Sequence, residues 1–120
     1  MVNGSSGVGA FNDDHIYLGY SGGSGRDAVA YTNNKIDFSG YTTLKAEVNI
    51  LSLGDSYYGF YLGVSNNKTS TDYEGFAAYK KSRTLGESTV SFDLSSYQGS
   101  YYAALNGSVA NVKVYKIWME

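Results

Sequence analysis

The sequence predicts an all-β protein, an antiparallel sandwich of two sheets with about eight strands in the jelly-roll arrangement. Three observations support this prediction. Apolar and polar residues alternate with a period of two in short runs that recur about every ten residues. Gly, Asn, Asp and Ser bound these runs and supply the turns of a chain without proline. No window shows the periodicity of a long helix.

The strand at residues 44–50 is the clearest, because four apolar side chains alternate with Lys45, Glu47 and Asn49. Such alternation predicts one buried face and one face in water. In the last strand Val112 and Val114 point inward, and the phase then slips by one residue, which predicts a β-bulge near Tyr115. In chain order, the expected strands cover residues 15–19, 28–32, 44–50, 57–64, 75–80, 89–94, 101–105 and 112–119.

In a jelly roll the first, eighth, third and sixth strands form one sheet, and the second, seventh, fourth and fifth form the other. The outward residues of the first sheet are mostly polar, which predicts an ordinary sheet face in contact with water. The second sheet differs, because small residues such as Gly63 and Ala104 separate the outward tyrosines. We expect a shallow trough there, and the candidate ligand-binding residues are Tyr31, Tyr57, Tyr61, Tyr79 and Tyr102.

Thirteen tyrosines in 120 residues are too many for one core of this size, so some rings must lie on the surface. Sugar rings stack on aromatic faces, and this favours a glycan ligand. The same rings would also suit an interface with another subunit or domain, or simply stabilise the sheet through cross-strand pairs. We therefore keep self-association or contact with domains of a parent protein as the alternative.

The composition disfavours several classes of binding partner and of site. The net charge of −2 and the even scatter of charges disfavour nucleic acid. No apolar run reaches the length of about 20 residues that a membrane-spanning helix needs. The absence of cysteine excludes disulfides and thiolate metal sites. Residues 1–10 (MVNGSSGVGA) are predicted to be a linker or a remnant of cloning, and residues 11–120 the β-sandwich module.

The sequence does not predict an enzyme. His15 is the sole histidine and stands beside no nucleophile motif. Asp72 and Glu74 are close in sequence, but they lie in a polar segment that does not suit the apolar pocket of a glycosidase acid. No cofactor is expected, although a structural calcium ion remains an alternative at Asn12-Asp13-Asp14 or where Asp37 meets Asp93.

Two stretches resemble known modules: KIDFSGYTTLKAEVNI at residues 35–50, and residues 88–120 from STVSFDL to the end. The stretch at residues 35–50 resembles the entry into the third strand of galactose-binding-like and carbohydrate-binding jelly rolls. The stretch at residues 88–120 is similar to the closing strands of modules appended to tail or minor structural proteins of phages and prophages. The resemblance implies a small non-catalytic sandwich, extracellular or virion-associated, that contacts glycan or cell-wall polysaccharide on a host surface.

Overall fold

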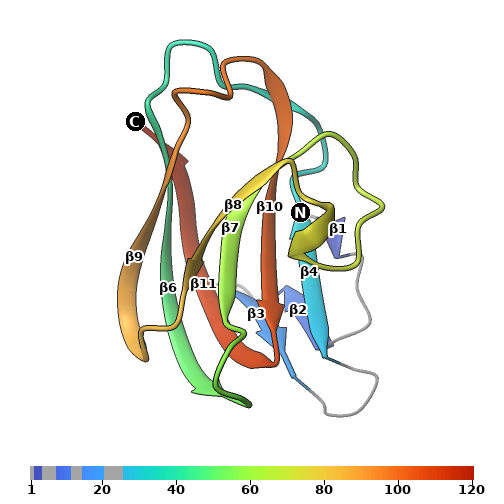
Figure 1. The fold of residues 1–120 in the computed structure, drawn as a ribbon, viewed down its shortest axis with the longest axis vertical. Helices are drawn as coiled ribbons and strands as arrows, with labels where there is room; N and C mark the ends of the chain where they lie inside the picture. The colour runs from blue at the N-terminus through green and yellow to red at the C-terminus, as the bar shows by residue number, and fades with distance from the viewer. Residues whose placement is uncertain (1, 4–7, 12–14, 21–25) are drawn as a thin grey trace.

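The computed structural model describes residues 2–3, 8–11, 15–20 and 26–120, and the structural statements below refer to these residues. They form two antiparallel sheets packed face to face (Figure 1). The strands are β1 (Val2–Asn3), β2 (Val8–Phe11), β3 (Ile16–Gly19), β4 (Asp27–Tyr31), β5 (Ile36–Asp37), β6 (Thr43–Leu53), β7 (Phe60–Ser65), β8 (Ala78–Ser82), β9 (Gly86–Asp93), β10 (Ser100–Ser108) and β11 (Ala110–Met119), and a single 3-10 turn, η1 (Tyr73–Gly75), precedes β8.

The predicted strand order is confirmed in both sheets. One sheet has the order β1-β4-β10-β7-β8, with β5 paired to β10, and the other has the order β2-β3-β11-β6-β9. Apart from β1, β2 and β5, these are the two sets of four strands expected of a jelly roll. All pairs are antiparallel, and the two sheets bury a shared core between them.

The main core follows the alternation in the sequence. In β6, Leu44, Ala46, Val48 and Ile50 are buried, and the residues between them are partly or fully exposed. Opposite them, β7 contributes Phe60, Leu62 and Val64, while β10 contributes Ala103 and Leu105. Burial of these apolar side chains is the main source of stability in a sandwich of this size.

The predicted bulge in the last strand is confirmed. Val114 pairs with Val48 and Lys116 pairs with Glu47, so Tyr115 is the extra residue. Another irregularity lies further along the same pair, where Asn111 faces Ser52 and Val112 faces Ile50, which leaves Leu51 as the extra residue of β6. Because each bulge shifts the phase by one residue, Ile117 and Met119 return to the core side while Trp118 faces outward beside Lys45.

Several expected boundaries are wrong. The strand expected at residues 101–105 continues as β10 to Ser108, so Asn106 and Gly107 lie inside it, and the chain reverses at Val109, which has a φ of 47°. A side chain at Gly107 would be tightly packed, because a Cβ atom would lie 3.0 Å from Cβ of Leu18 in the facing sheet. Residues 57–59 precede β7, and β8 begins at Ala78, after η1.

Part of the segment expected to be a linker, Val2–Asn3 and Val8–Phe11, pairs with β4 and β3 respectively. The division of the chain at residue 10 remains a prediction. In the part of the chain that the structure describes, there is no helix with the length and apolarity that a bilayer crossing requires.

Candidate functional site

The outer face of the β4–β10–β7–β8 sheet carries the tyrosines, as the alternation predicts. Tyr31, Ala104, Gly63 and Tyr79 pair in one row across four strands. Tyr61 lies two residues before Gly63 on β7. Since residues two apart on a strand share a face, the side chains of Tyr61 and Tyr79 reach the same side of the sheet.

A smaller core, separate from the main one, covers this outer face. It consists of Val29, Tyr31, Tyr61, Tyr73, Phe76 and Ala104, with Tyr58 and Tyr102 packed against it. Its cover is the segment between β7 and β8, residues 66–77, which carries η1 across the sheet (Figure 1). The ring of Tyr73 stacks on the ring of Tyr61 with a centroid separation of 3.9 Å and an interplanar angle of 4°.

Polar contacts fix the covering segment to the sheet. The Tyr31 hydroxyl donates to the carbonyl of Ser70 at 2.6 Å, and the Phe76 ring meets Tyr31 edge-on. The buried Asn106 accepts from the backbone N–H of Tyr73 through Oδ1 and donates to the carbonyl of Ala28 through Nδ2. Hydrogen bonds of this kind hold the segment in one position, because buried amides are costly to leave unpaired.

This cover corrects the expectation of an open trough. Tyr31 and Tyr61 are 0% and 1% exposed, so neither ring presents a face to solvent. Their burial has a simple cause, since Tyr73 and Phe76 pack with them and with the small residue Ala104 in the same cluster. Tyr57 and Tyr79, in contrast, are 60% and 45% exposed.

The exposed rings belong to a group of Tyr57, Tyr58, Tyr61, Tyr73 and Tyr79 that we call the tyrosine cluster. Tyr79 meets Tyr61 and Tyr73 edge-on at 5.3 and 5.0 Å between centroids. Tyr58 lies 6.3 Å from Tyr73 and meets Tyr57 edge-on at 4.9 Å. The buried Tyr61–Tyr73 stack therefore supports exposed rings on its flanks, in arrangements that aromatic quadrupoles favour.

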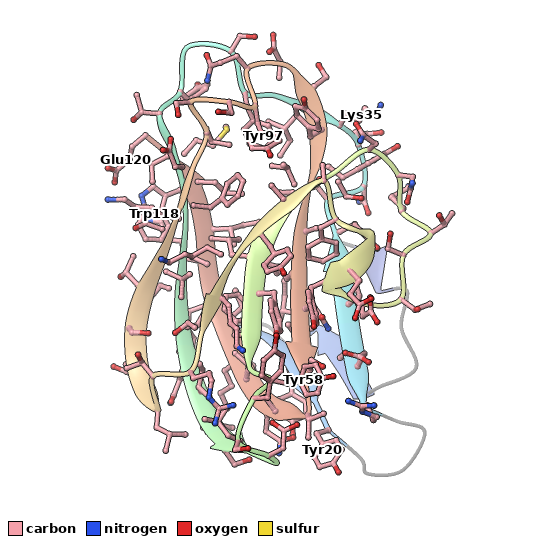
Figure 2. All side chains as sticks on the ribbon, viewed as in Figure 1. Tyr20, Lys35, Tyr58, Tyr97, Trp118 and Glu120 are labelled. Carbon is pink, nitrogen blue, oxygen red and sulfur yellow. The ribbon has the colours of Figure 1, made fainter. Side chains whose placement is uncertain are left out.

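Two cationic side chains lie against rings of the tyrosine cluster. The Lys81 ammonium lies 3.7 Å from the Tyr57 ring centroid, and the Arg26 guanidinium lies 5.0 Å from that of Tyr58. Figure 2 shows Tyr58 at the same end of the sandwich as Tyr20. Asp55 positions Tyr57 and Tyr58 by accepting from both of their backbone N–H groups. These rings thus lie on a structured surface with positive charge at its border.

Tyr102 stands apart from the tyrosine cluster. Its ring is half-buried against the smaller core, and the Lys35 and Lys68 ammonium groups lie 5.9 and 5.4 Å from its centroid. In Figure 2 Lys35 is at the opposite end of the molecule from Tyr58. Of the five candidate residues, the structure brings Tyr57, Tyr61 and Tyr79 into one cluster and leaves Tyr31 and Tyr102 outside its ring contacts.

Burial changes the acidity of the covered tyrosines. It raises the pKa of Tyr61, Tyr73 and Tyr31, because the charged phenolate loses its hydration. For Tyr31 the hydrogen bond to Ser70 offsets part of this increase in pKa. The Tyr61 hydroxyl is buried without a well-formed hydrogen bond to any described residue. These hydroxyls remain protonated at neutral pH.

The acidic residues considered for catalysis or calcium make local structural contacts. Asp72 accepts from the backbone N–H of Glu74 at the start of η1. Asp37 and Asp93 accept from the backbone N–H groups of Ser39 and Ser95, and these bonds lower the pKa of each carboxyl group. Among the described residues no three His, Cys, Asp or Glu side chains gather as a metal site would require. Asn12-Asp13-Asp14 lies outside the described residues.

Sequence reasoning missed Tyr58, Tyr73 and Phe76. The alternation places Tyr58 on the core side only if the strand extends back to residue 57, whereas β7 begins at Phe60. Tyr73 and Phe76 stand as aromatic residues at the end of an otherwise polar loop, and this is the signal that the loop packs against something. Trp118 donates from Nε1 to Glu120 on the outer face of the other sheet (Figure 2).

Comparisons with protein-family models, curated proteins and solved structures found no match. The likeness of residues 35–50 and 88–120 to carbohydrate-binding and phage-tail modules therefore remains an expectation.

Proposed function

We propose that the chain is a non-catalytic carbohydrate-binding module that recognises glycan on a host or cell surface through the exposed rings of the tyrosine cluster. The setting implied by the resemblance, an extracellular or virion-associated protein such as a phage tail protein, is part of this proposal. One observation carries it: the exposed Tyr79 meets both rings of the buried Tyr61–Tyr73 stack edge-on, and the exposed Tyr57 joins the same cluster through Tyr58.

The arrangement suits a sugar ring for two reasons. Tyr79 is braced by edge-on contacts with Tyr61 and Tyr73, so it loses little conformational freedom when a ligand stacks on it. Lys81 and Arg26 add hydrogen-bond donors at the border, where sugar hydroxyl groups need them. A shallow surface of this kind binds weakly at each site, and repeated copies would multiply its affinity.

The test is a glycan array followed by titration of the best ligand, monitored by tyrosine fluorescence. We expect Tyr57→Ala and Tyr79→Ala each to weaken binding about 3- to 10-fold, which corresponds to the roughly 0.5–1.5 kcal/mol of one aromatic contact. Tyr41→Ala is the matched control, because Tyr41 is exposed and its described hydrogen bonds are made by its backbone. Equal affinity in all three variants would refute the proposal.

A structural module for oligomerisation or docking is the alternative candidate. It is favoured by β8, an edge strand that pairs with β7 alone among the described strands and carries the exposed Tyr79. An unpaired strand edge next to exposed aromatic rings is a common place for another chain to add. The mass in solution decides between the two: a stable oligomer in which Tyr57 and Tyr79 resist iodination supports assembly, whereas a monomer with reactive rings supports ligand binding.

A further inference from the structure

A polar groove lies where the edge strands of the two sheets face each other. It has a volume of about 510 Å³ and is lined by β8, β9 and the turn that joins them. Among the described strands each pairs on one side only, β8 with β7 and β9 with β6. Figure 1 shows both strands on the same side of the sandwich, so the groove is an opening between the sheets, beside the outer face that carries the tyrosines.

Three cations line this groove, and none of its described lining residues is acidic. They are Lys80, Lys81 and Arg83. Arg83 is already engaged, because it donates to the carbonyls of Tyr58 and Asp55 and forms a 3.7 Å ion pair with the Asp55 carboxylate. Lys80 makes no ion pair with any described residue. The groove therefore holds positive charge that the described part of the chain does not neutralise.

The strand register directs Lys80 into the opening. Lys80 pairs with Leu62 and Ser82 pairs with Phe60, and both of these partners point into the main core. Lys80 and Ser82 thus lie on the core side of β8, at a place where the edge of the sandwich gives them access to water. Lys81, on the other side of the same strand, reaches the Tyr57 ring.

Hydroxyl groups supply the rest of the lining. Serine and threonine side chains come from both strands, and Val90 is the apolar exception. Ser88 pairs with the buried Val48, so it faces the interior at the bottom of the groove. Its Oγ atom is buried and has no hydrogen-bond partner among the described residues, and such an unmet hydrogen bond is costly.

We propose that the groove between β8 and β9 binds an acidic glycan, with the Lys80 ammonium contacting the carboxylate or phosphate of the sugar and the serine and threonine hydroxyls contacting its hydroxyl groups. Unpaired cations select the anionic ligand, and a wall of hydroxyls favours a polyhydroxylated one over an apolar peptide. Lys81 borders both this groove and the tyrosine cluster, but the contacts proposed here use Lys80 and the hydroxyl groups and none of the rings. The proposal therefore stands independently of the function proposed above.

The experiment titrates the whole chain with three ligands at low salt: an oligogalacturonate, a poly(glycerol phosphate) oligomer, and a neutral galacto-oligosaccharide of matched length. We expect one or both acidic ligands to bind, to shift the backbone amide resonances of residues 80–82 and 88–91, and to weaken as salt rises. The two acidic ligands distinguish a carboxylate from a phosphate. Failure of both to bind at millimolar concentration overturns the proposal, as does equal binding of the neutral ligand.

Variants locate the site. Lys80→Gln should weaken binding about tenfold, as expected for loss of one charge-assisted hydrogen bond. Lys113→Gln, on the outer face of the other sheet, is the matched control and should leave affinity unchanged. Unchanged melting temperatures confirm that both variants fold. If Tyr57→Ala abolishes binding of the acidic ligand and Lys80→Gln has no effect, the ligand belongs to the tyrosine cluster and the groove proposal is wrong.

Discussion

The Tyr73 ring lies parallel to the Tyr61 ring, with 3.9 Å between centroids, and this stack joins the segment between β7 and β8 to the outer face of the sheet. Tyr73 belongs to η1, and its backbone N–H is held by Asn106 of β10. A single residue thus links three parts of the chain. It also braces Tyr79, one of the two most exposed rings of the tyrosine cluster.

Removal of the Tyr73 ring should therefore destabilise the protein and uncover Tyr61. We expect Tyr73→Ala to lower the free energy of unfolding by about 2–3 kcal/mol, somewhat less than a fully enclosed aromatic residue, because Tyr73 lies at the surface of the smaller core. Urea denaturation measures this loss. Tyr73→Phe keeps the stack and should lose less than about 1 kcal/mol.

Chemical modification provides an independent measurement for the same variants. Tyr61 should resist iodination in the parent protein and in Tyr73→Phe, and react in Tyr73→Ala. If Tyr61 is equally reactive in all three, then residues 66–77 do not cover it in solution, and the open trough expected from the sequence is restored.

Replacing tyrosine by phenylalanine should have opposite effects on stability at two buried positions, Tyr31 and Tyr61. The Tyr31 hydroxyl donates to the Ser70 carbonyl, whereas the Tyr61 hydroxyl has no well-formed partner among the described residues. We expect Tyr31→Phe to lower the free energy of unfolding by about 1 kcal/mol through loss of a hydrogen bond. Tyr61→Phe should raise it by about 0.5–1 kcal/mol, since a buried hydroxyl without a well-formed hydrogen bond is removed. Equal effects of the two substitutions in urea denaturation would contradict this assignment.

The buried tyrosines should also make stability depend on alkaline pH. Burial raises the pKa of Tyr61, Tyr73 and Tyr31 in the folded state above the ordinary value of 10.0. A group with a raised pKa keeps its proton longer when folded, so its contribution to stability is complete below the ordinary value and is lost as the pH rises through the folded pKa. Each such tyrosine contributes a loss of up to about 1.4 kcal/mol per pH unit.

Urea denaturation at about pH 8 and at several values between about pH 10 and pH 12 measures this loss. Tyr61→Phe should reduce the slope, because it removes one of the three groups. The parent protein gives the reference slope. A slope in Tyr61→Phe equal to that of the parent protein would show that Tyr61 ionises normally and is therefore not buried.

The two faces of each strand could be predicted from the sequence, because alternation with a period of two depends only on which side chains meet water. The bulge at Tyr115 was predictable for the same reason, since Val114 and Ile117 cannot both face the core without an extra residue between them. The strand order came instead from the jelly-roll arrangement that eight such strands commonly adopt. Alternation says which side of a strand a residue is on. It does not say what covers that side.

The candidate site was therefore only partly predictable. Tyr31 and Tyr61 do lie on the outer face, but contacts distant in sequence bury them: Tyr31 with Ser70 and Phe76, and Tyr61 with Tyr73.

The contact that Asn106 makes could not be predicted from the sequence either. The glycine that follows it favours a turn, but its role in holding Tyr73 depends on a fold-back of the chain that local patterns do not encode. The β8–β9 groove joins two edge strands from different sheets, and it too required the tertiary structure.

Gly63 controls how closely β8 approaches β7, and thereby the positions of Tyr79 and Lys80. A Cβ atom on Gly63 would lie 2.0 Å from the carbonyl oxygen of Ala78, a backbone atom that can move only if β8 shifts. We expect Gly63→Ala to lower the free energy of unfolding by about 2–4 kcal/mol, as overpacking against a fixed backbone does. Gly99→Ala is the matched control, because its Cβ would meet a Tyr101 ring carbon at an ordinary 3.7 Å.

The shift of β8 should appear in binding as well as in stability. Tyr79 and Lys80 are adjacent on β8. We therefore expect Gly63→Ala to weaken both the binding of a ligand to the tyrosine cluster and the binding of the acidic ligand to the groove. Gly99→Ala should leave both affinities unchanged, since Gly99 lies outside both sites. Amide spectra of the folded fraction would show the displacement at residues 78–82. Wild-type stability and wild-type spectra in Gly63→Ala would mean that β7 and β8 do not pair in the register that places Gly63 opposite Tyr79.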